Sequence, residues 1–376
     1  MNTIDPGPGR RMASLAMSAA LCGAGMQAEA GTFEVLHHFD GADGANPIVT
    51  MVLDSAGVLH GATKYRPRAG HEPSGTLFHI HTDGTGFETD HAFTRHEARY
   101  PAGDLSIDAS DTIYGTLIDA GENGAIFTED PVNGYQVLVA IGHGVGSRPY
   151  GGVTPGPDGT LYGTTAEGGG HPCACGTVYK WDPVTRKFTV LHKFLREDDG
   201  AAPYAPLLLR GETLYGTTFW GGPFSVRIDG TGFEAYTPNE GYQFNSGLTP
   251  DAQGNLWGVV DGGAYGAGGI YRVTPAGVYQ WRASFKRGQG EGPTGTLVLG
   301  QDGLMYGNAA SGGTQRMGTI FSYDPVANVI TKLHDFDGPH GSHPYDGLVQ
   351  DASGTLYGVT FDGGKHGYGV IFRIVP

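Results

Sequence analysis

The chain is poor in positive charge. Its 376 residues include 23 Lys and Arg against 38 Asp and Glu, which gives a net charge of −15. It also has no run of Lys and Arg of the kind that binds nucleic acid. A surface of this sign repels phosphate backbones. We therefore exclude nucleic acid from the expected partners.

Long hydrophobic runs are also missing, because no apolar segment reaches the ~20 residues of a membrane-spanning helix. The longest, residues 12–26, follows Arg10-Arg11 and precedes Ala28-Glu29-Ala30. Charge, a short apolar run and small residues in this order are typical of a secretory signal peptide; the alternative, an anchoring helix, needs a longer run. We expect residues 1–30 to be removed and the protein to be secreted, periplasmic or extracellular, with no transmembrane segment.

Glycine, in contrast, is abundant. There are 66 glycines, and aromatic residues make up 11% of the chain, a composition that indicates a turn-rich all-β protein. A string of an aliphatic residue, an aromatic residue or His, and Gly occurs seven times at intervals of 42 to 54 residues. The seven strings are Leu59-His60-Gly61, Ile113-Tyr114-Gly115, Leu161-Tyr162-Gly163, Leu214-Tyr215-Gly216, Leu256-Trp257-Gly258, Met305-Tyr306-Gly307 and Leu356-Tyr357-Gly358.

Each repeat contains four strand-sized segments separated by turn residues. In the third repeat these segments are residues 151–155, 160–165, 176–182 and 187–194. Residues 32–39 resemble a fourth segment with no first three before it, and the last repeat ends after its third. We predict that residues 31–376 form one seven-bladed β-propeller with four antiparallel strands per blade. The N-terminal strand completes the last blade and leaves no open sheet edge.

The repeated string resembles a known family. Leu333-His334-Asp335-Phe336 and Thr355-Leu356-Tyr357-Gly358-Val359-Thr360 are similar to the motif of the tandem-repeat proteins called GloVer repeats, with their LYGTT and GG strings. The resemblance covers nearly all of the predicted mature chain. It implies a fold and no particular chemistry.

Comparison among the repeats separates structural residues from functional ones. His37, His192 and His334 occupy one repeat position, so we expect them to pack structurally. Turn aspartates such as Asp54 and Asp351 also recur, so we interpret them as turn residues.

Departures from the repeat gather in the loops after the second and fourth strands, which share one face of a propeller. Loops on this face carry function more often than strands do, and an acidic chain here concentrates Arg, His and Tyr. The predicted substrate-binding residues are Lys64, Arg66, Arg68, Arg99, Tyr100, His143, Arg148 and Tyr150.

His60 replaces the aromatic residue that every other repeat has at its position, and the paired third strand carries His79 and His81. With Tyr65, these are the predicted catalytic residues. Such a set suits β-elimination on a uronic acid. Arginine neutralises the carboxylate, His or Tyr removes the adjacent C5 proton, and a second group protonates the leaving oxygen.

In architecture and residue types the chain is similar to the seven-bladed propeller lyases that cleave ulvan and related uronate polysaccharides. This resemblance implies a polysaccharide lyase acting on an acidic polysaccharide or oligosaccharide. The alternative is a non-catalytic propeller at the cell surface or in the periplasm that binds a glycan or a protein. The residues leave both open, because arginine serves catalysis and binding equally well.

The cysteines outside the predicted signal peptide lie in the string His171-Pro172-Cys173-Ala174-Cys175 of the third repeat. His171, Cys173 and Cys175, with His192 as a fourth ligand, would form a structural zinc site. A disulfide between Cys173 and Cys175 is the alternative in an oxidising compartment, and an unligated pair is a third. Either cross-link would pin a long loop.

Overall fold

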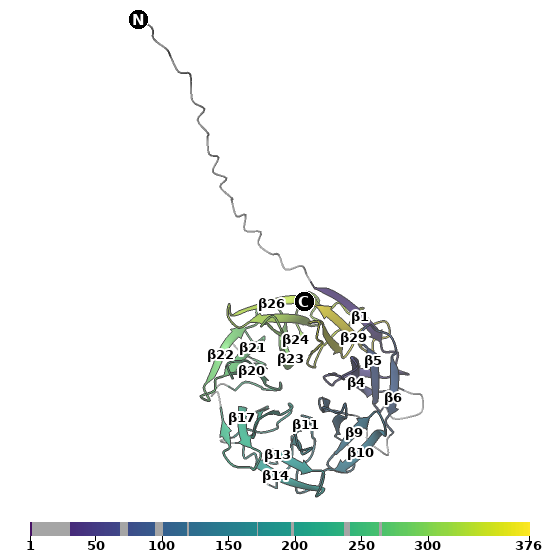
Figure 1. Cartoon of the computed structure of the whole chain (residues 1–376), viewed down its shortest axis with the longest axis vertical. Helices are drawn as coiled ribbons and strands as arrows, with labels where there is room; N and C mark the ends of the chain where they lie inside the picture. The colour runs from purple at the N-terminus through teal and green to yellow at the C-terminus, as the bar shows by residue number, and fades with distance from the viewer. Residues whose placement is uncertain are drawn as a thin grey trace.

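The computed structural model describes residues 1, 31–67, 74–94, 101–118, 120–170, 172–196, 199–236, 241–262 and 265–376. Within these ranges every regular element is a strand, and the strands form seven sheets around one axis (Figure 1). The predicted seven-bladed propeller is confirmed. The described residues contain no helix that is long and apolar enough to span a membrane. The predicted signal peptide lies outside them.

Blades are numbered in chain order. Blade 1 consists of β2 (Ala45–Pro47), β3 (Val52–Leu53), β4 (Val58–Tyr65), β5 (Thr76–His81) and β6 (Glu88–Ala92). Blade 2 consists of β7 (Ser106–Ile107), β8 (Ile113–Leu117), β9 (Ala125–Asp130) and β10 (Gly134–Ala140). Blade 3 consists of β11 (Val153–Pro155), β12 (Leu161–Thr165), β13 (Thr177–Asp182) and β14 (Lys187–Lys193).

Blade 4 consists of β15 (Leu208–Arg210), β16 (Thr213–Thr218), β17 (Gly222–Arg227) and β18 (Glu234–Ala235). Blade 5 consists of β19 (Thr249–Pro250), β20 (Leu256–Val260), β21 (Gly269–Val273) and β22 (Tyr279–Ser284). Blade 6 consists of β23 (Glu291–Leu299), β24 (Met305–Ser311), β25 (Thr319–Asp324) and β26 (Val329–Asp335). Blade 7 consists of β27 (Val349–Gln350), β28 (Leu356–Thr360), β29 (Val370–Val375) and β1 (Thr32–His38).

Chain order within a blade runs outward from the axis. In Figure 1, β11 and β23 lie near the centre of the ring, while β14, β10, β6 and β22 lie at its edge. The one exception to chain order is blade 7, whose outer strand is β1, paired antiparallel to β29 from Thr32↔Val375 to His38↔Val370. Arg373 of β29 also binds Glu34 of β1 at 2.6 Å. The predicted closure by the N-terminal strand is therefore confirmed.

The glycine of the repeated string is explained by close packing within each blade. A Cβ on Gly358 would lie 2.6 Å from the ring of Phe372, and one on Gly307 would lie 2.7 Å from that of Phe321. Each ring belongs to the next strand of the same sheet and lies over the glycine, so a side chain would collide with it.

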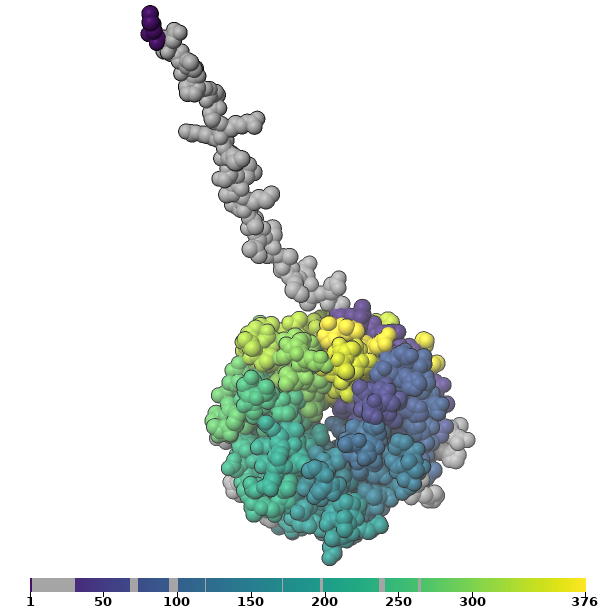
Figure 2. All heavy atoms as spheres, in the orientation of Figure 1, coloured from purple at the N-terminus to yellow at the C-terminus, as the bar shows by residue number. Residues whose placement is uncertain are grey.

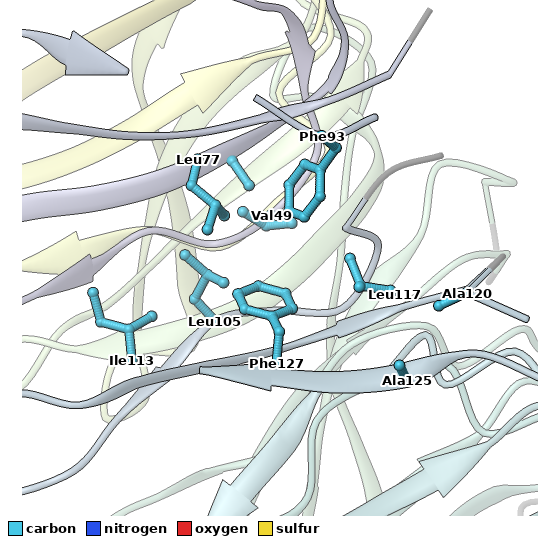
Figure 3. Close-up of a cluster of buried hydrophobic side chains, with 10 residues drawn as sticks. Val49, Leu77, Phe93, Leu105, Ile113, Leu117, Ala120, Ala125 and Phe127 are labelled. Atoms are coloured by element: carbon cyan, nitrogen blue, oxygen red, sulfur yellow. The ribbon is translucent and has the colours of Figure 1, made fainter. Parts of the chain in front are cut away.

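Apolar residues fill the spaces between blades. Between blades 1 and 2 the buried cluster includes Val49, Leu77, Phe93, Leu105, Ile113 and Phe127 (Figure 3). These side chains come from strands and connecting segments of both blades. Burial at interfaces of this kind stabilises the ring at roughly 25 cal/mol per Å² of apolar surface.

The repeated histidines of the outer strands connect neighbouring blades. His192 of blade 3 stacks on Phe233 of blade 4 at 3.6 Å, and His334 of blade 6 stacks on Phe33 of β1 at 3.7 Å. His37 stacks in the same way on Phe87. These contacts confirm that the shared histidines are packing residues.

Candidate functional site

Two hollows among the described residues are candidate sites, because each brings together several ionisable or aromatic side chains. The first, which we call the interblade cleft, lies between blades 1 and 2 and has a volume of about 430 Å³. The second, the central funnel, lies at the axis of the ring and has a volume of about 250 Å³. Figure 2 shows a narrow opening at this axis.

The interblade cleft contains the three predicted catalytic histidines. β4 and β5 pair so that His60 lies opposite His79, and the two ring centroids are 5.9 Å apart. His60 Nε2 lies 3.2 Å from Asp54 Oδ2, and His79 Nδ1 lies 2.6 Å from Asp90 Oδ1. His81, at the end of β5, lines the same cleft. Two imidazoles are thus each oriented by a carboxylate.

The contact between His60 and Asp54 reproduces a contact made in other blades. Tyr114 Oη donates a hydrogen bond to Asp108 at 2.9 Å, and Trp257 Nε1 donates one to Asp251 at 2.8 Å. The imidazole of His60 therefore plays the same structural role as the aromatic residue at this position in the other blades. It differs in having a second nitrogen, Nδ1, which is buried and has no hydrogen-bond partner among the described residues.

Glu129 of β9 is a cleft residue that the sequence argument missed. Burial raises the pKa of its carboxyl, and the nearby charge of Asp90 raises it further, to about 8. The repeat itself carried the signal, because the equivalent residues of the other blades are apolar or aromatic: Ile80, Trp181, Val226, Val273, Tyr323 and Ile374. The cleft thus combines two imidazoles with a carboxyl that is protonated near neutral pH, which is the composition of an acid–base site.

Tyr65 and Arg66 do not reach this cleft. His60 lies near the start of β4 and Tyr65 at its end, and five residues of strand span roughly 17 Å. Arg66 Nε instead donates to the carbonyl of Ala42 at 2.6 Å, and Lys64 lies over the ring of Tyr65. The structure therefore separates the predicted acid–base histidines from these predicted partners, because strand direction places them at opposite ends of blade 1.

The other predicted binding residues divide between the rim and the funnel. Arg148 Nη1 pairs with Glu167 at 3.2 Å, and His143 Nε2 pairs with Glu122 at 2.8 Å. Tyr150 lines the central funnel. Arg68, Arg99 and Tyr100 lie outside the described residues.

Two tyrosines of the central funnel, Tyr204 and Tyr345, are 36% and 44% exposed and are thus more exposed than its carboxyls. We call the tyrosine side the wall of the funnel and the carboxyl side its floor. Tyr150, Tyr204 and Tyr345 come from the segments that enter blades 3, 4 and 7, and they line the funnel with Asp104 and Asp346. Burial raises the pKa of both carboxyls, and the charge of Asp104 raises that of Asp346 further. Sequence comparison between blades did not single out either aspartate.

Cys173 and Cys175 are joined in a disulfide. His192, the fourth predicted zinc ligand, is 2.8 Å from Asp199 and stacked on Phe233. In the described part of the chain no three His, Cys, Asp or Glu residues are arranged to hold a metal ion. The structure thus matches the predicted disulfide, and neither sulfur is available as a zinc ligand while this bond is present. A zinc site that includes His171, which lies outside the described residues, stays a prediction for the reduced protein.

The fold and its repeat define the class of protein: a seven-bladed β-propeller built from tandem repeats of one four-stranded unit. The chain belongs to the family of the Gloeobacter/Verrucomicrobia repeat, which matches residues 24–228 and again residues 224–376. This confirms the family indicated by the repeated string. No curated protein sequence matches the chain.

Solved structures share the fold at low identity. An oligogalacturonate lyase from Vibrio parahaemolyticus is 14% identical, with a TM-score of 0.59 over 93% of this chain and 98% of that one. An oligogalacturonate lyase in complex with manganese is also 14% identical, with a TM-score of 0.58 over 92% and 96%. The extracellular domain of a putative one-component system from B. thetaiotaomicron is 13% identical, with a TM-score of 0.60 over 92% of this chain. The chain spans 40% of that domain's length. At such identities these likenesses show the fold.

Proposed function

We propose that the protein is a secreted saccharide-binding propeller and that its ligand enters the central funnel. One observation carries this proposal: Tyr150, Tyr204 and Tyr345 surround a hollow whose floor bears carboxyl and amide oxygens. Sugar rings have apolar C–H faces that pack on aromatic rings, and their hydroxyls bond to such oxygens. The predicted signal peptide supports secretion.

Size and relatives agree with this proposal. A volume of about 250 Å³ lies just below the usual range of small-molecule sites, roughly 300–1,000 Å³. The funnel therefore suits one terminal sugar unit better than a continuous chain. The fold is shared over almost the whole chain with proteins named as oligogalacturonate lyases, which supports a saccharide as the class of ligand.

Titration calorimetry against a panel of oligosaccharides tests the proposal. Tyr204→Ala and Tyr345→Ala should each weaken binding by about 3- to 10-fold, because each removes an aromatic contact. Tyr265→Ala is the matched control, since Tyr265 is 70% exposed and does not line the funnel. If both funnel variants bound saccharides with wild-type affinity, the site would lie elsewhere. If the wild type bound no saccharide, the proposal would be overturned.

A polysaccharide lyase in the interblade cleft is the second candidate function. The observation that favours it is the pair of carboxylate-held imidazoles beside the protonated Glu129. In β-elimination one imidazole would take the C5 proton, the C–H electron pair would form a C4=C5 double bond, and a second group would protonate the departing oxygen. This function ranks second because no Arg or Lys lines the described part of the cleft to neutralise a uronate carboxylate.

The ultraviolet absorbance of the unsaturated product tests this second candidate. His60→Tyr is a suitable variant, because it restores the aromatic residue of the other blades and keeps a donor for Asp54. A uronate polymer cleaved by the wild type, but not by His60→Tyr or His79→Ala, would establish a lyase. No increase in absorbance with any uronate polymer excludes it.

A further inference from the structure

The floor of the central funnel holds oxygen atoms that can accept hydrogen bonds and that lack partners. Asp346 Oδ2, Asn245 Oδ1 and Thr296 Oγ1 are each buried and have no partner among the described residues. All three residues line the funnel together with Asp104. Buried acceptors are normally paired in folded proteins, so this floor lacks a donor that the described fold does not provide.

The two carboxyls at this floor are departures from the repeat. Where blade 7 has Asp346, the other blades have small residues: Val49, Gly103, Gly151, Ala205, Ser246 and Gly295. Where blade 2 has Asp104, the others have Thr50, Gly152, Pro206, Gly247, Thr296 and Gly347. Six blades close without a carboxyl at each position, so the repeat does not require either one. Asp104 Oδ1 also accepts a hydrogen bond from the backbone N of Thr50 in blade 1 at 3.0 Å.

The funnel offers no positive charge to balance these groups. The described lining contains no Lys, Arg or His. At the rim, Arg148 pairs with Glu167 at 3.2 Å, so this cation is matched by its own carboxylate. Burial raises the pKa of Asp346, and the charge of Asp104 adds to this effect. Burial thus favours the protonated forms of both carboxyls in the empty funnel. A cation would stabilise their ionised forms, whereas a negatively charged ligand would disfavour them further.

We propose that the funnel selects saccharides that carry a free primary amino group, with the ammonium at the floor and the sugar ring between the tyrosines. An ammonium has three N–H donors and no acceptor, which matches a floor of unpaired acceptors. Binding stabilises the carboxylate of Asp346, so that residue releases its proton when the amine enters. This inference rests on the proposed saccharide function and names the class of sugar. It also assigns the funnel to a cationic ligand, in contrast to the acidic glycan expected from the rim arginines.

The test uses three β-1,4-linked oligosaccharides of equal length: glucosamine, N-acetylglucosamine and glucose oligomers. Calorimetry on the full protein should show glucosamine oligomers binding about tenfold or more tightly than the other two, because a charge-assisted hydrogen bond is added. Asp346→Asn and Asp104→Asn should each reduce this preference severalfold. The exposed turn residue Asp229 supplies the control, Asp229→Asn, which should leave all three affinities unchanged.

The outcomes separate the two proposals. Equal affinity for all three oligomers, still weakened by Tyr204→Ala, would overturn the amine inference and keep the saccharide function. No binding of any oligosaccharide would overturn the saccharide function itself. Thermal unfolding monitors the variants, and Asp346→Asn should unfold no earlier than wild type, because it removes a buried ionisable group.

Discussion

At the scale of single residues, comparison among blades distinguishes what the ring requires from what it only tolerates. His60 departs from the repeat, yet it keeps the contact with a turn aspartate that tyrosine and tryptophan make in other blades. Glu129 departs from the repeat without such a substitute, because a carboxyl replaces an apolar core residue. We expect the buried carboxyl of Glu129 to lower the free energy of unfolding by an amount that depends on pH.

Glu129 should make the free energy of unfolding fall as pH rises. Its folded pKa, about 8, lies above the ordinary value of 4.5. Between these values the folded state keeps a proton that the unfolded state has lost, so stability decreases across this window. Relative to wild type, Glu129→Gln should gain roughly 2–4 kcal/mol between about pH 5 and about pH 8, measured by urea unfolding.

The matched control for this measurement is Glu88→Gln, which changes an exposed glutamate on β6. Its effect on the free energy of unfolding should be the same at both pH values. If the effect of Glu129→Gln on the free energy of unfolding were also the same at both pH values, the carboxyl would be ionised in the folded state. Its assignment as a proton donor would then be wrong.

At the scale of elements, β1 is the strand on which the ring depends. It supplies the outer edge of blade 7, pairs with β29, and stacks Phe33 on His334 of blade 6. No other strand connects the two ends of the chain in this way. The ring should therefore be as stable with β1 attached after β29 as with β1 at the N-terminus, provided that β1 is present.

A circular permutant tests this expectation. Thr32 pairs with Val375, so the loop of residues 183–186, which connects the last two strands of blade 3, can join β29 to β1. The protein that begins at residue 40 and ends with β1 should keep a cooperative thermal transition near that of wild type. Deletion of β1 without this transfer should abolish the transition, because it exposes the edge of β29 and the core beneath it. If the permutant and the deletion variant unfolded at the same temperature with equal cooperativity, β1 would be dispensable.

At the scale of the whole molecule, a ring with a net charge of −15 attracts cations over long distances. The funnel adds two carboxyls at the axis, where seven blades meet. The net charge attracts a cation, and the floor carboxyls ionise when a cation enters the funnel. Both effects therefore favour a positively charged ligand.

Salt should weaken this attraction. Between about 0.02 M and about 0.5 M NaCl, affinity for glucosamine oligomers should fall by roughly tenfold, because the screening length shortens severalfold. Affinity for glucose oligomers should stay constant, which makes them the internal control. Identical salt dependence for both ligands would contradict an electrostatic contribution to selectivity.

The sequence by itself determined the ring. Glycine beneath an aromatic ring recurs in all seven blades, and turn aspartates recur in most of them. Both are local features with one structural solution, and the incomplete first and last repeats predict how the ring closes. The sequence also predicted that His60 lies near a histidine of the next strand, because consecutive strands of a blade pair antiparallel. The register in the structure decides for His79 over His81.

Only the tertiary structure decided which side chains meet in a candidate site. Tyr65 and His60 share one strand, but the structure places them at its opposite ends. Asp104 and Asp346 belong to blades 2 and 7 and meet only because ring closure brings the inner strands together at one axis. A carboxyl's pKa depends on burial and on neighbours that are distant in sequence, and no local pattern encodes these until the ring is closed.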